Sequence, residues 1–258
     1  MGKMIVAAQT FTIREFMQDD ENVIASLNKV KDIGYKSVQL SGFALNESKV
    51  LVDTIRELGI NVCSTHIKYE RFVNELDMAI EEHLALGCDR IGLGSMPGEF
   101  SKEKRDGFLR FIDWFNGVGE KTAKHGIKVC YHNHKFEFEK FGDKLGIDLL
   151  IENASENVEF VLDSYWIQAG GASPAAYFEK VKDRMKICHF KDMAILDNNQ
   201  IFAPIGEGNI DFAPVMEACK KANVKYIAIE QDKCLRDPFD CLKSSYEYLM
   251  KNFGDDLE

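Results

Sequence analysis

One junction recurs along the chain: a helical pattern ends, a glycine follows, and a short apolar strand pattern begins. It occurs at Gly34, Gly59, Gly87 and Gly126. Glycine just past a helix adopts the left-handed conformation that closes the last turn, and Asn223 can do the same. Two more junctions, before residues 158–163 and 186–190, keep the change of pattern without the glycine. With a first strand near residue 4, these seven junctions predict eight strands that alternate with helices.

The eight predicted strands are short apolar runs, at residues 4–9, 36–40, 61–66, 89–93, 127–132, 158–163, 186–190 and 226–230. They lack a clean alternation of apolar and polar residues, as expected for strands covered on both faces. Alternating strands and helices imply an α/β protein with a parallel sheet, and eight such units fit a single-domain (β/α)8 TIM barrel over residues 1–258. A doubly wound open sheet is the alternative, but no Gly-x-Gly-x-x-Gly follows the first strand. The tail, residues 255–258, is predicted to be frayed.

Charge and composition exclude several classes of partner. The net charge of −10 argues against nucleic acid, which requires a basic surface. No apolar run approaches the roughly 20 residues of a membrane span, and the apolar run at the N-terminus is too short for a signal peptide. The seven cysteines form no Cys-x-x-Cys pair and are expected to be small buried hydrophobic residues. We therefore predict a cytoplasmic protein, monomeric or a small homo-oligomer.

In barrels of this kind the chemistry lies at the carboxyl ends of the strands. The polar residues found there are Gln9 with Arg14 beyond it, Gln39, His66, His132, His134 and Glu137, Asp163, His189 and Lys191, and Glu230. The fourth strand ends in Gly92–Ser95 and offers little beyond a close approach of the backbone. Residues two apart in a strand share a face, so His132 and His134 can lie on one side of the sheet.

Five of the eight strands end in a histidine or an acid directly after an apolar run. Imidazole and carboxylate groups together suit divalent zinc, manganese, iron or cobalt. Taken singly, an acid at such a position is more often a helix cap, His66 is as often structural, and Lys191 is as often a surface residue. The aromatic residues nearby, including Trp166, are more often packing than sugar platforms. The coincidence of Asp163, His189 and Glu230 at equivalent positions favours a functional site.

Several strings resemble one family. They are residues 6–14, Tyr131–Phe138 (Tyr-His-Asn-His-x-x-Glu-Phe), 162–166, 189–192 and 205–212. Over nearly its whole length the chain resembles the xylose isomerase-like TIM barrels, which include sugar phosphate isomerases/epimerases, inosose dehydratases, ketose 3-epimerases and, more distantly, enzymes of the endonuclease IV type.

The resemblance implies one divalent metal ion (manganese, zinc, iron, cobalt or magnesium) held by residues of strands five to eight. Three family ligands carry over onto Asp163, His189 and Glu230. The fifth-strand ligand is a glutamate in the family; here His132 aligns best with it, and Glu137 is the second choice. The resemblance also suggests that Lys191, Arg14 and His66 contact substrate hydroxyls or support the site. Gln9 and Trp166 complete the candidate substrate-binding residues.

The chemistry that such a site supports is enolisation of a sugar, with the metal as a Lewis acid. One group removes the proton beside the carbonyl; its return from the other face gives epimerisation, and its return to the neighbouring carbon gives isomerisation. Candidate proton carriers are Glu230, Glu137 and His134. The sequence thus predicts a metal-dependent isomerase or epimerase of a carbohydrate, either a free sugar or a cyclitol. Phosphate is disfavoured because Glu207, between Gly206 and Gly208, would repel it.

Three other functions compete with this prediction. A metal-dependent lyase or dehydratase acting on a keto-sugar, keto-glycoside or inosose would use the same residues. A non-catalytic sugar-binding barrel is favoured if no metal binds. Phosphodiester cleavage needs a multi-metal cluster and a basic groove, whereas the chain has six histidines and a charge of −10.

Overall fold

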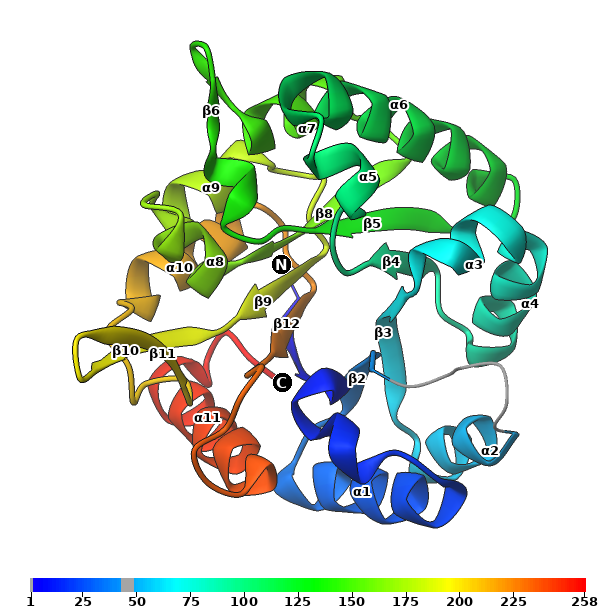
Figure 1. Cartoon of the computed structure of the whole chain (residues 1–258). Coiled ribbons are helices and arrows are strands. Elements are labelled where there is room, and N and C mark those ends of the chain that lie inside the picture. The colour runs from blue at the N-terminus through cyan, green and yellow to red at the C-terminus, as the bar shows by residue number, and fades with distance from the viewer. Residues whose placement is uncertain (1, 43–48) are drawn as a thin grey trace.

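The computed structural model describes residues 2–42 and 49–258, and its centre is a closed barrel of eight parallel strands (Figure 1). The strands are β1 (Ile5–Gln9), β2 (Ser37–Leu40), β3 (Asn61–Ile67), β4 (Arg90–Leu93), β5 (Lys128–His132), β8 (Val158–Asp163), β9 (Ile187–Phe190) and β12 (Tyr226–Ile229). Each strand pairs with the barrel strands before and after it in the chain, and β12 closes the ring on β1. The predicted (β/α)8 barrel is confirmed.

Helices surround the barrel (Figure 1). They are α1 (Asp20–Ile33), α2 (Lys49–Leu58), α3 (Tyr69–Asn74), α4 (Leu76–Leu86), α5 (Gly98–Ser101), α6 (Lys104–Ala123), α7 (Gly146–Asn153), α8 (Ser164–Ala169), α9 (Pro174–Lys180), α10 (Phe212–Lys221) and α11 (Pro238–Phe253), with 3₁₀ turns η1 (Thr10–Phe16) and η2 (Phe136–Phe138). Where the sequence predicted room for one helix, three connections hold two. In the last of these, α8 ends at Gly170 and the side chain of Ser173 caps a new helix with Pro174 in its first turn.

The predicted helix-to-strand junctions have the expected backbone. A residue within three positions of the helix end has a positive φ: Gly34 (123°), Gly59 (62°), Gly87 (67°), Gly126 (74°) and Asn223 (56°). At Gly87 the backbone N–H closes α4 by donating to the carbonyls of His83 and Leu84. These turns send the chain from the helical layer back into the barrel.

A two-stranded hairpin, β10 (Asp192–Leu196) and β11 (Asn199–Ala203), follows β9 directly and projects beyond the ring of helices (Figure 1). Its turn residues Asp197 and Asn198 both have positive φ, 48° and 62°, as a two-residue hairpin turn requires. Neither this hairpin nor the shorter one formed by β6 (Lys140–Phe141) and β7 (Lys144–Leu145) was predicted from the sequence.

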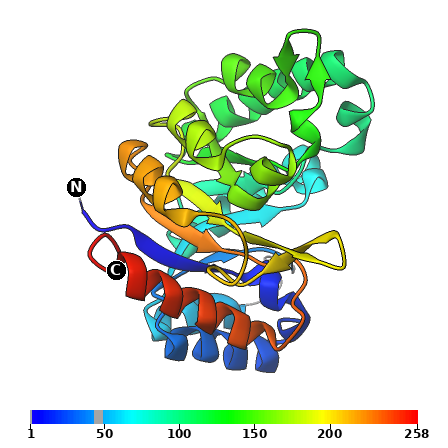
Figure 2. The same ribbon diagram turned by 90° about the vertical axis from the view of Figure 1, so that its left-hand side faces the viewer.

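The chain's last residues are ordered, so the prediction of a frayed tail was wrong. Leu257 forms a parallel bridge with Met4, and the Glu258 N–H donates to the Met4 carbonyl at 2.9 Å. Leu257 is 1% exposed because its apolar side chain packs into the core beside the start of β1. Figure 2 shows both chain ends on one side of the molecule and the β10–β11 hairpin on the other.

The inside of the barrel is divided between an apolar base and a polar carboxyl end. Small and apolar side chains fill the base: Ala7, Cys63, Cys130, Val161, Ile187, Tyr226 and Ala228. All seven cysteines are free, and the predicted burial is found for six of them; Cys234 is only partly buried. Among the described residues, no helix has both the length and the apolar character needed to cross a membrane. The apolar base leaves the carboxyl ends of the strands as the place where polar side chains meet.

Candidate functional site

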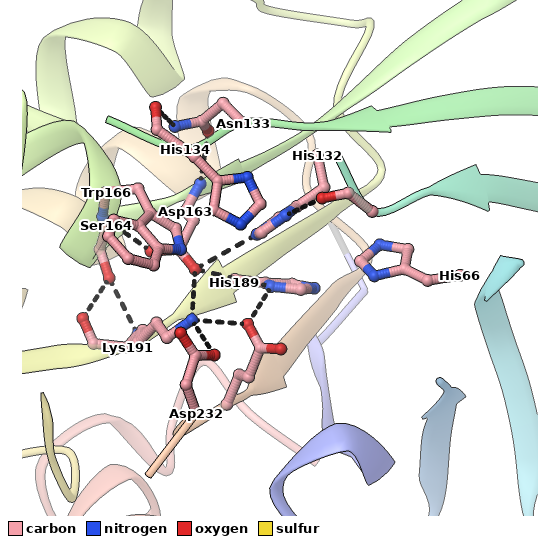
Figure 3. A network of polar contacts seen from close by, with 12 residues as sticks. His66, His132, Asn133, His134, Asp163, Ser164, Trp166, His189, Lys191 and Asp232 are labelled. Carbon is pink, nitrogen blue, oxygen red and sulfur yellow. Dashed lines mark hydrogen bonds and ion pairs between the residues drawn. The ribbon is translucent and has the colours of Figure 1, made fainter. Parts of the chain in front are cut away.

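Four buried side chains converge where four adjacent strands end. Figure 3 labels three of them, His132, Asp163 and His189. His132 ends β5, Asp163 ends β8, His189 lies in β9, and Glu230 directly follows β12. Because these strands are consecutive around the barrel, one nitrogen or oxygen atom from each residue lies within 4.8 Å of the others. All four are at most 5% exposed. Nitrogen and carboxylate donors gathered in this way could hold a divalent metal ion.

Neighbouring groups fix which nitrogen of each imidazole faces this cluster. Nδ1 of His132 lies 2.9 Å from the Gly94 carbonyl oxygen, which only accepts, so Nδ1 carries the proton. Nε2 of His189 likewise donates to Oε1 of Gln39 at 2.5 Å. The other nitrogen of each ring then faces a carboxylate: His132 Nε2 lies 3.3 Å from Asp163 Oδ2. Histidines that bind metals usually donate their second N–H to such an outer partner. The four residues therefore fit a cation.

The charges of the site also leave room for a cation. The buried Lys191 ammonium lies 3.0 Å from Glu230 Oε2, 2.6 Å from Asp232 Oδ1 and 3.6 Å from Asp163 Oδ2. Burial by itself would raise the pKa of Asp163 and Glu230, but Lys191 and the imidazoles hold both pKa values well below their usual range. Without an ion, Glu230 and Asp163 raise the pKa of His189 to about 9, so its ring carries part of the balancing charge. With both imidazoles neutral, three carboxylates and one ammonium leave two negative charges, which one divalent ion would neutralise.

A cavity of about 1410 Å³ opens onto this cluster. The polar side chains that line it near the cluster are His66, His132, His134, Glu230 and Asp232, and Arg14, Lys68 and Arg71 lie further out. Asp163 and His189 are buried behind these residues. The part of the cavity wall nearest the cluster is thus formed by imidazole and carboxylate groups.

The structure places the predicted substrate-binding residues at different depths. His66 and Arg14 line the cavity. Arg14 donates to the Phe11 carbonyl at 2.6 Å and stacks on the Phe11 ring. Gln9 is fully buried; its Oε1 accepts from the Phe11 N–H, and its Nε2 has no partner among the described residues.

Lys191 and Trp166 do not line this cavity. Lys191 is 1% exposed and contacts the carboxylates of Glu230 and Asp232, so it is not a surface residue. Trp166 is half-buried, with its ring 5.0 Å from that of His134 and 5.1 Å from the Lys191 ammonium. Its Nε1 is buried without a partner among the described residues.

Glu137 lies apart from the four donors. Its carboxylate accepts from the Tyr131 hydroxyl at 2.5 Å and from the His134 N–H at 2.9 Å, and burial raises its pKa to about 8. The reason is local: the chain turns into η2 after β5, which folds Glu137 back on its own loop. The structure thus puts His132, and not Glu137, with Asp163, His189 and Glu230. His134 does line the cavity, and burial lowers its pKa to about 3.

Two residues of the site were not assigned from the sequence. Asp232 lines the cavity and pairs with Lys191. Asp232 follows Glu230 by two positions, and residues two apart in a strand share a face. The same spacing led to the prediction for His132 and His134, so Asp232 could have been assigned to the site in the same way. Gln39 was recognised only as a strand end, yet it contacts both His189 and His66.

The Gly206–Gly208 loop has no free N–H groups for a phosphate. Asp192 Oδ2 accepts the N–H of Gly206 at 2.9 Å and that of Gly208 at 3.0 Å. Glu207 pairs with Arg236 at 2.5 Å. Asp192 thus anchors the loop, while the charge of Glu207, which was expected to repel phosphate, is paired with Arg236.

Comparison with known proteins identifies related sequences. The family model of the xylose isomerase-like TIM barrel matches residues 27–244. Inosose dehydratase of Geobacillus thermodenitrificans is 25% identical over 174 residues, 60% of this chain and 57% of that protein. Inosose dehydratase of Clostridium beijerinckii is 24% identical over 55% of this chain and 53% of that protein. The matches thus span little more than half the length of these curated relatives.

Solved structures of similar fold cover almost the entire chain. A sugar phosphate isomerase/epimerase from Parabacteroides distasonis superposes with a TM-score of 0.80, 23% identity and coverage of 98% of this chain and 99% of that one. An L-ribulose 3-epimerase gives 0.74, 15% identity and coverage of 99% and 96%. A 3-keto-D-glucoside 4-epimerase from E. coli gives 0.70, 18% identity and coverage of 96% and 100%. At these identities the likeness establishes the fold alone.

Proposed function

The chain belongs to the xylose isomerase-like TIM barrel family, and on that basis we propose that it is a metal-dependent isomerase or epimerase of a free sugar or cyclitol. The observation that carries the proposal is the group of four buried donors, two imidazoles and two carboxylates, whose nitrogen and oxygen atoms all lie within 4.8 Å of one another. Structural neighbours that are named as sugar isomerases and epimerases support the same reaction class.

His132, Asp163, His189 and Glu230 would hold one divalent ion of manganese, zinc, iron, cobalt or magnesium. The set has no thiolate. Counted together with Asp232 and Lys191 and with both imidazoles neutral, the site has two excess negative charges, which match the charge of such an ion. When bound, the metal supplies Lewis-acid polarisation of the substrate carbonyl. A sugar bound in the cavity would lie beside these four residues.

Glu230 is our first candidate for the residue that removes the proton beside the carbonyl. Its Oε2 faces His189 and Lys191, and its side chain lines the cavity, which leaves Oε1 for the substrate. His134 is the second candidate, because its side chain lines the cavity. Glu137 is a weaker candidate since Tyr131 and the loop backbone already use its carboxylate. Proton return from a second group gives epimerisation or isomerisation.

Dehydration of an inosose or keto-sugar is the alternative function. It is favoured by the curated relatives, which are inosose dehydratases. The same base would remove the same proton, and loss of a hydroxyl group one carbon further would replace proton return. We also place the protein in the cytoplasm, because its seven free cysteines suit a reducing compartment.

The test begins with the metal content of the purified protein. We expect about one equivalent of a divalent metal in the wild type, strongly reduced in His189→Ala and Glu230→Ala. His125→Ala, at an exposed position, is the matched control and should keep the metal. Metal-free protein that gains none on addition of these ions would contradict the proposal and favour a sugar-binding barrel.

Candidate ketoses and inososes are then screened in heavy water. Deuterium entering the carbon beside the carbonyl, with the formula of the sugar otherwise unchanged, would support an isomerase or epimerase. Loss of water to an unsaturated ketone, detected by its ultraviolet absorption, would instead support the dehydratase alternative.

A further inference from the structure

Gln39 connects a member of the donor cluster to a residue of the cavity wall. It lies in β2, on the opposite side of the barrel from β8, and it is fully buried. Its Oε1 lies 2.5 Å from His189 Nε2, and its Nε2 lies 3.0 Å from His66 Nε2. Figure 3 shows the His66 ring beside those of His132 and His189, which all approach the same space.

The chemistry of an amide fixes the protons along this chain of contacts. An amide oxygen only accepts, so Nε2 of His189 carries a proton, and Nδ1 of His189 is the nitrogen left facing Glu230. The amide nitrogen of Gln39 only donates, so Nε2 of His66 must accept. A neutral imidazole has one N–H, and the proton of His66 therefore lies on Nδ1. Because Nε2 of His66 accepts, it carries no proton, and the ring is neutral.

The Nδ1 atom of His66 is directed at the cavity wall. A Cβ atom placed on Gly94 would lie 3.3 Å from it, and both residues line the cavity. Among the described residues, none is hydrogen-bonded to this atom, and it is not among the fully enclosed polar atoms without a partner. An N–H group is thus presented where a ligand oxygen can reach it.

We infer that Gln39 is a positioning residue that sets the tautomer of His66. Through the same amide group it also determines that Nδ1 of His189 is the nitrogen that can take a metal. The amide oxygen of Gln39 can only accept and its nitrogen can only donate. Neither histidine ring can therefore change tautomer unless the Gln39 amide group rotates by 180°. The use of the His66 N–H, to hold an oxygen of the substrate, rests on the proposed function. The tautomer itself does not.

The experiment is nitrogen-15 NMR of protein labelled at its six histidines and loaded with diamagnetic Zn²⁺. Long-range proton–nitrogen correlations show which nitrogen of each ring is protonated, and the His66→Gln variant identifies the His66 signals. We expect wild-type His66 to be protonated at Nδ1. In Gln39→Glu, both carboxylate oxygens accept, so the proton of His66 should move to Nε2.

His83 is an internal control in the same spectra. Its Nδ1 donates to the Ala79 carbonyl at 2.6 Å, and its Nε2 accepts from the Thr65 hydroxyl at 2.7 Å. It should keep the Nδ1-protonated form in every variant, which also reports that the variant is folded.

Gln39→Met is the second variant, for the case that a buried carboxylate prevents folding. It removes both contacts, and His66 should then populate both tautomers. Wild-type His66 protonated at Nε2, or a pure Nδ1–H form retained in Gln39→Met, would overturn the inference. Because no sugar is present, these outcomes are independent of whether the protein turns out to be an isomerase.

Discussion

The ammonium nitrogen of Lys191 lies 3.0 Å from Oε2 of Glu230, inside the barrel and out of contact with solvent. The same oxygen lies 3.0 Å from Nδ1 of His189. Burial alone would lower the pKa of Lys191, but the surrounding carboxylates hold it above its usual value. Lys191 is therefore a permanent cation that keeps the carboxylates of the site ionised and in place.

Replacing Lys191 by methionine should destabilise the metal-free protein by about 3–5 kcal/mol, the cost of leaving buried charge without its partner. Addition of Mn²⁺ should restore more stability to this variant than to the wild type, because the ion then meets three uncompensated carboxylates. Urea unfolding in EDTA and in excess Mn²⁺ measures both effects. Lys182→Met, at an exposed lysine, is the matched control. Equal stability of Lys191→Met and wild type in EDTA would contradict the prediction.

Asp163 should have two separable roles. Its Oδ2 faces the cluster, and its Oδ1 accepts the Trp166 N–H at 3.0 Å as the cap of α8. Asp163→Asn keeps a capping oxygen and Asp163→Ala does not, so the alanine variant should be less stable by about 1 kcal/mol. Both variants should bind much less metal. Metal analysis and urea unfolding in EDTA test this, and wild-type metal content in Asp163→Asn would remove Asp163 from the proposed ligand set.

Acid should destabilise the protein through His83. Burial lowers the pKa of His83 from 6.5 to about 4 in the folded state. Between pH 6.5 and pH 4, His83 is therefore protonated in the unfolded chain and neutral in the folded one. The contribution of His83 to the free energy of unfolding is fully present above pH 6.5. It is lost as the pH falls toward 4, and the total loss is about 3 kcal/mol.

Unfolding free energies measured at pH 7 and pH 4.5 test this effect. His83→Gln should lose less stability on acidification than wild type, whereas His125→Gln, at an exposed histidine, should match wild type. An identical pH dependence in wild type and His83→Gln would show that His83 is not the sensitive group.

Leu257 should contribute to stability as a core residue. Leu257→Ala removes a side chain that is 1% exposed, and a loss of about 2–5 kcal/mol is expected. Leu235→Ala, at a leucine that is 65% exposed, should change the free energy of unfolding little. If the two variants unfold at the same urea concentration, the C-terminal bridge adds nothing to the stability of the barrel.

The features that could be predicted from the sequence, the helix ends, the strands and the residues at the strand ends, are those that depend on the local sequence pattern. Helix-closing residues such as Gly87 and Asn223 and the apolar strands between them have a local cause, and parallel strands bring their carboxyl ends together without further information. Asp163, His189 and Glu230 could be singled out for this reason, and so could His132.

What the sequence did not predict depends on the direction of single side chains. The position of Glu137 depends on a tight turn that returns its carboxylate to Tyr131. The burial of Lys191 depends on acids from two other strands, and that of Leu257 on a contact with Met4, more than 250 residues earlier. Such pairings across the barrel leave no periodic trace along the chain.

Asp192 anchors both ends of the hairpin that follows β9. Its Oδ1 accepts the N–H of Met193 at 2.7 Å and that of Ile210 at 3.1 Å, while its Oδ2 holds Gly206 and Gly208. The hairpin is thus bracketed by one carboxylate, and Phe202 at its base packs on Tyr165 and Trp166. Residues 194–201 can therefore be exchanged for hairpins of other lengths, which would alter the outer rim of the barrel. Lys191, the residue before Asp192, would keep its ion pairs with the buried carboxylates.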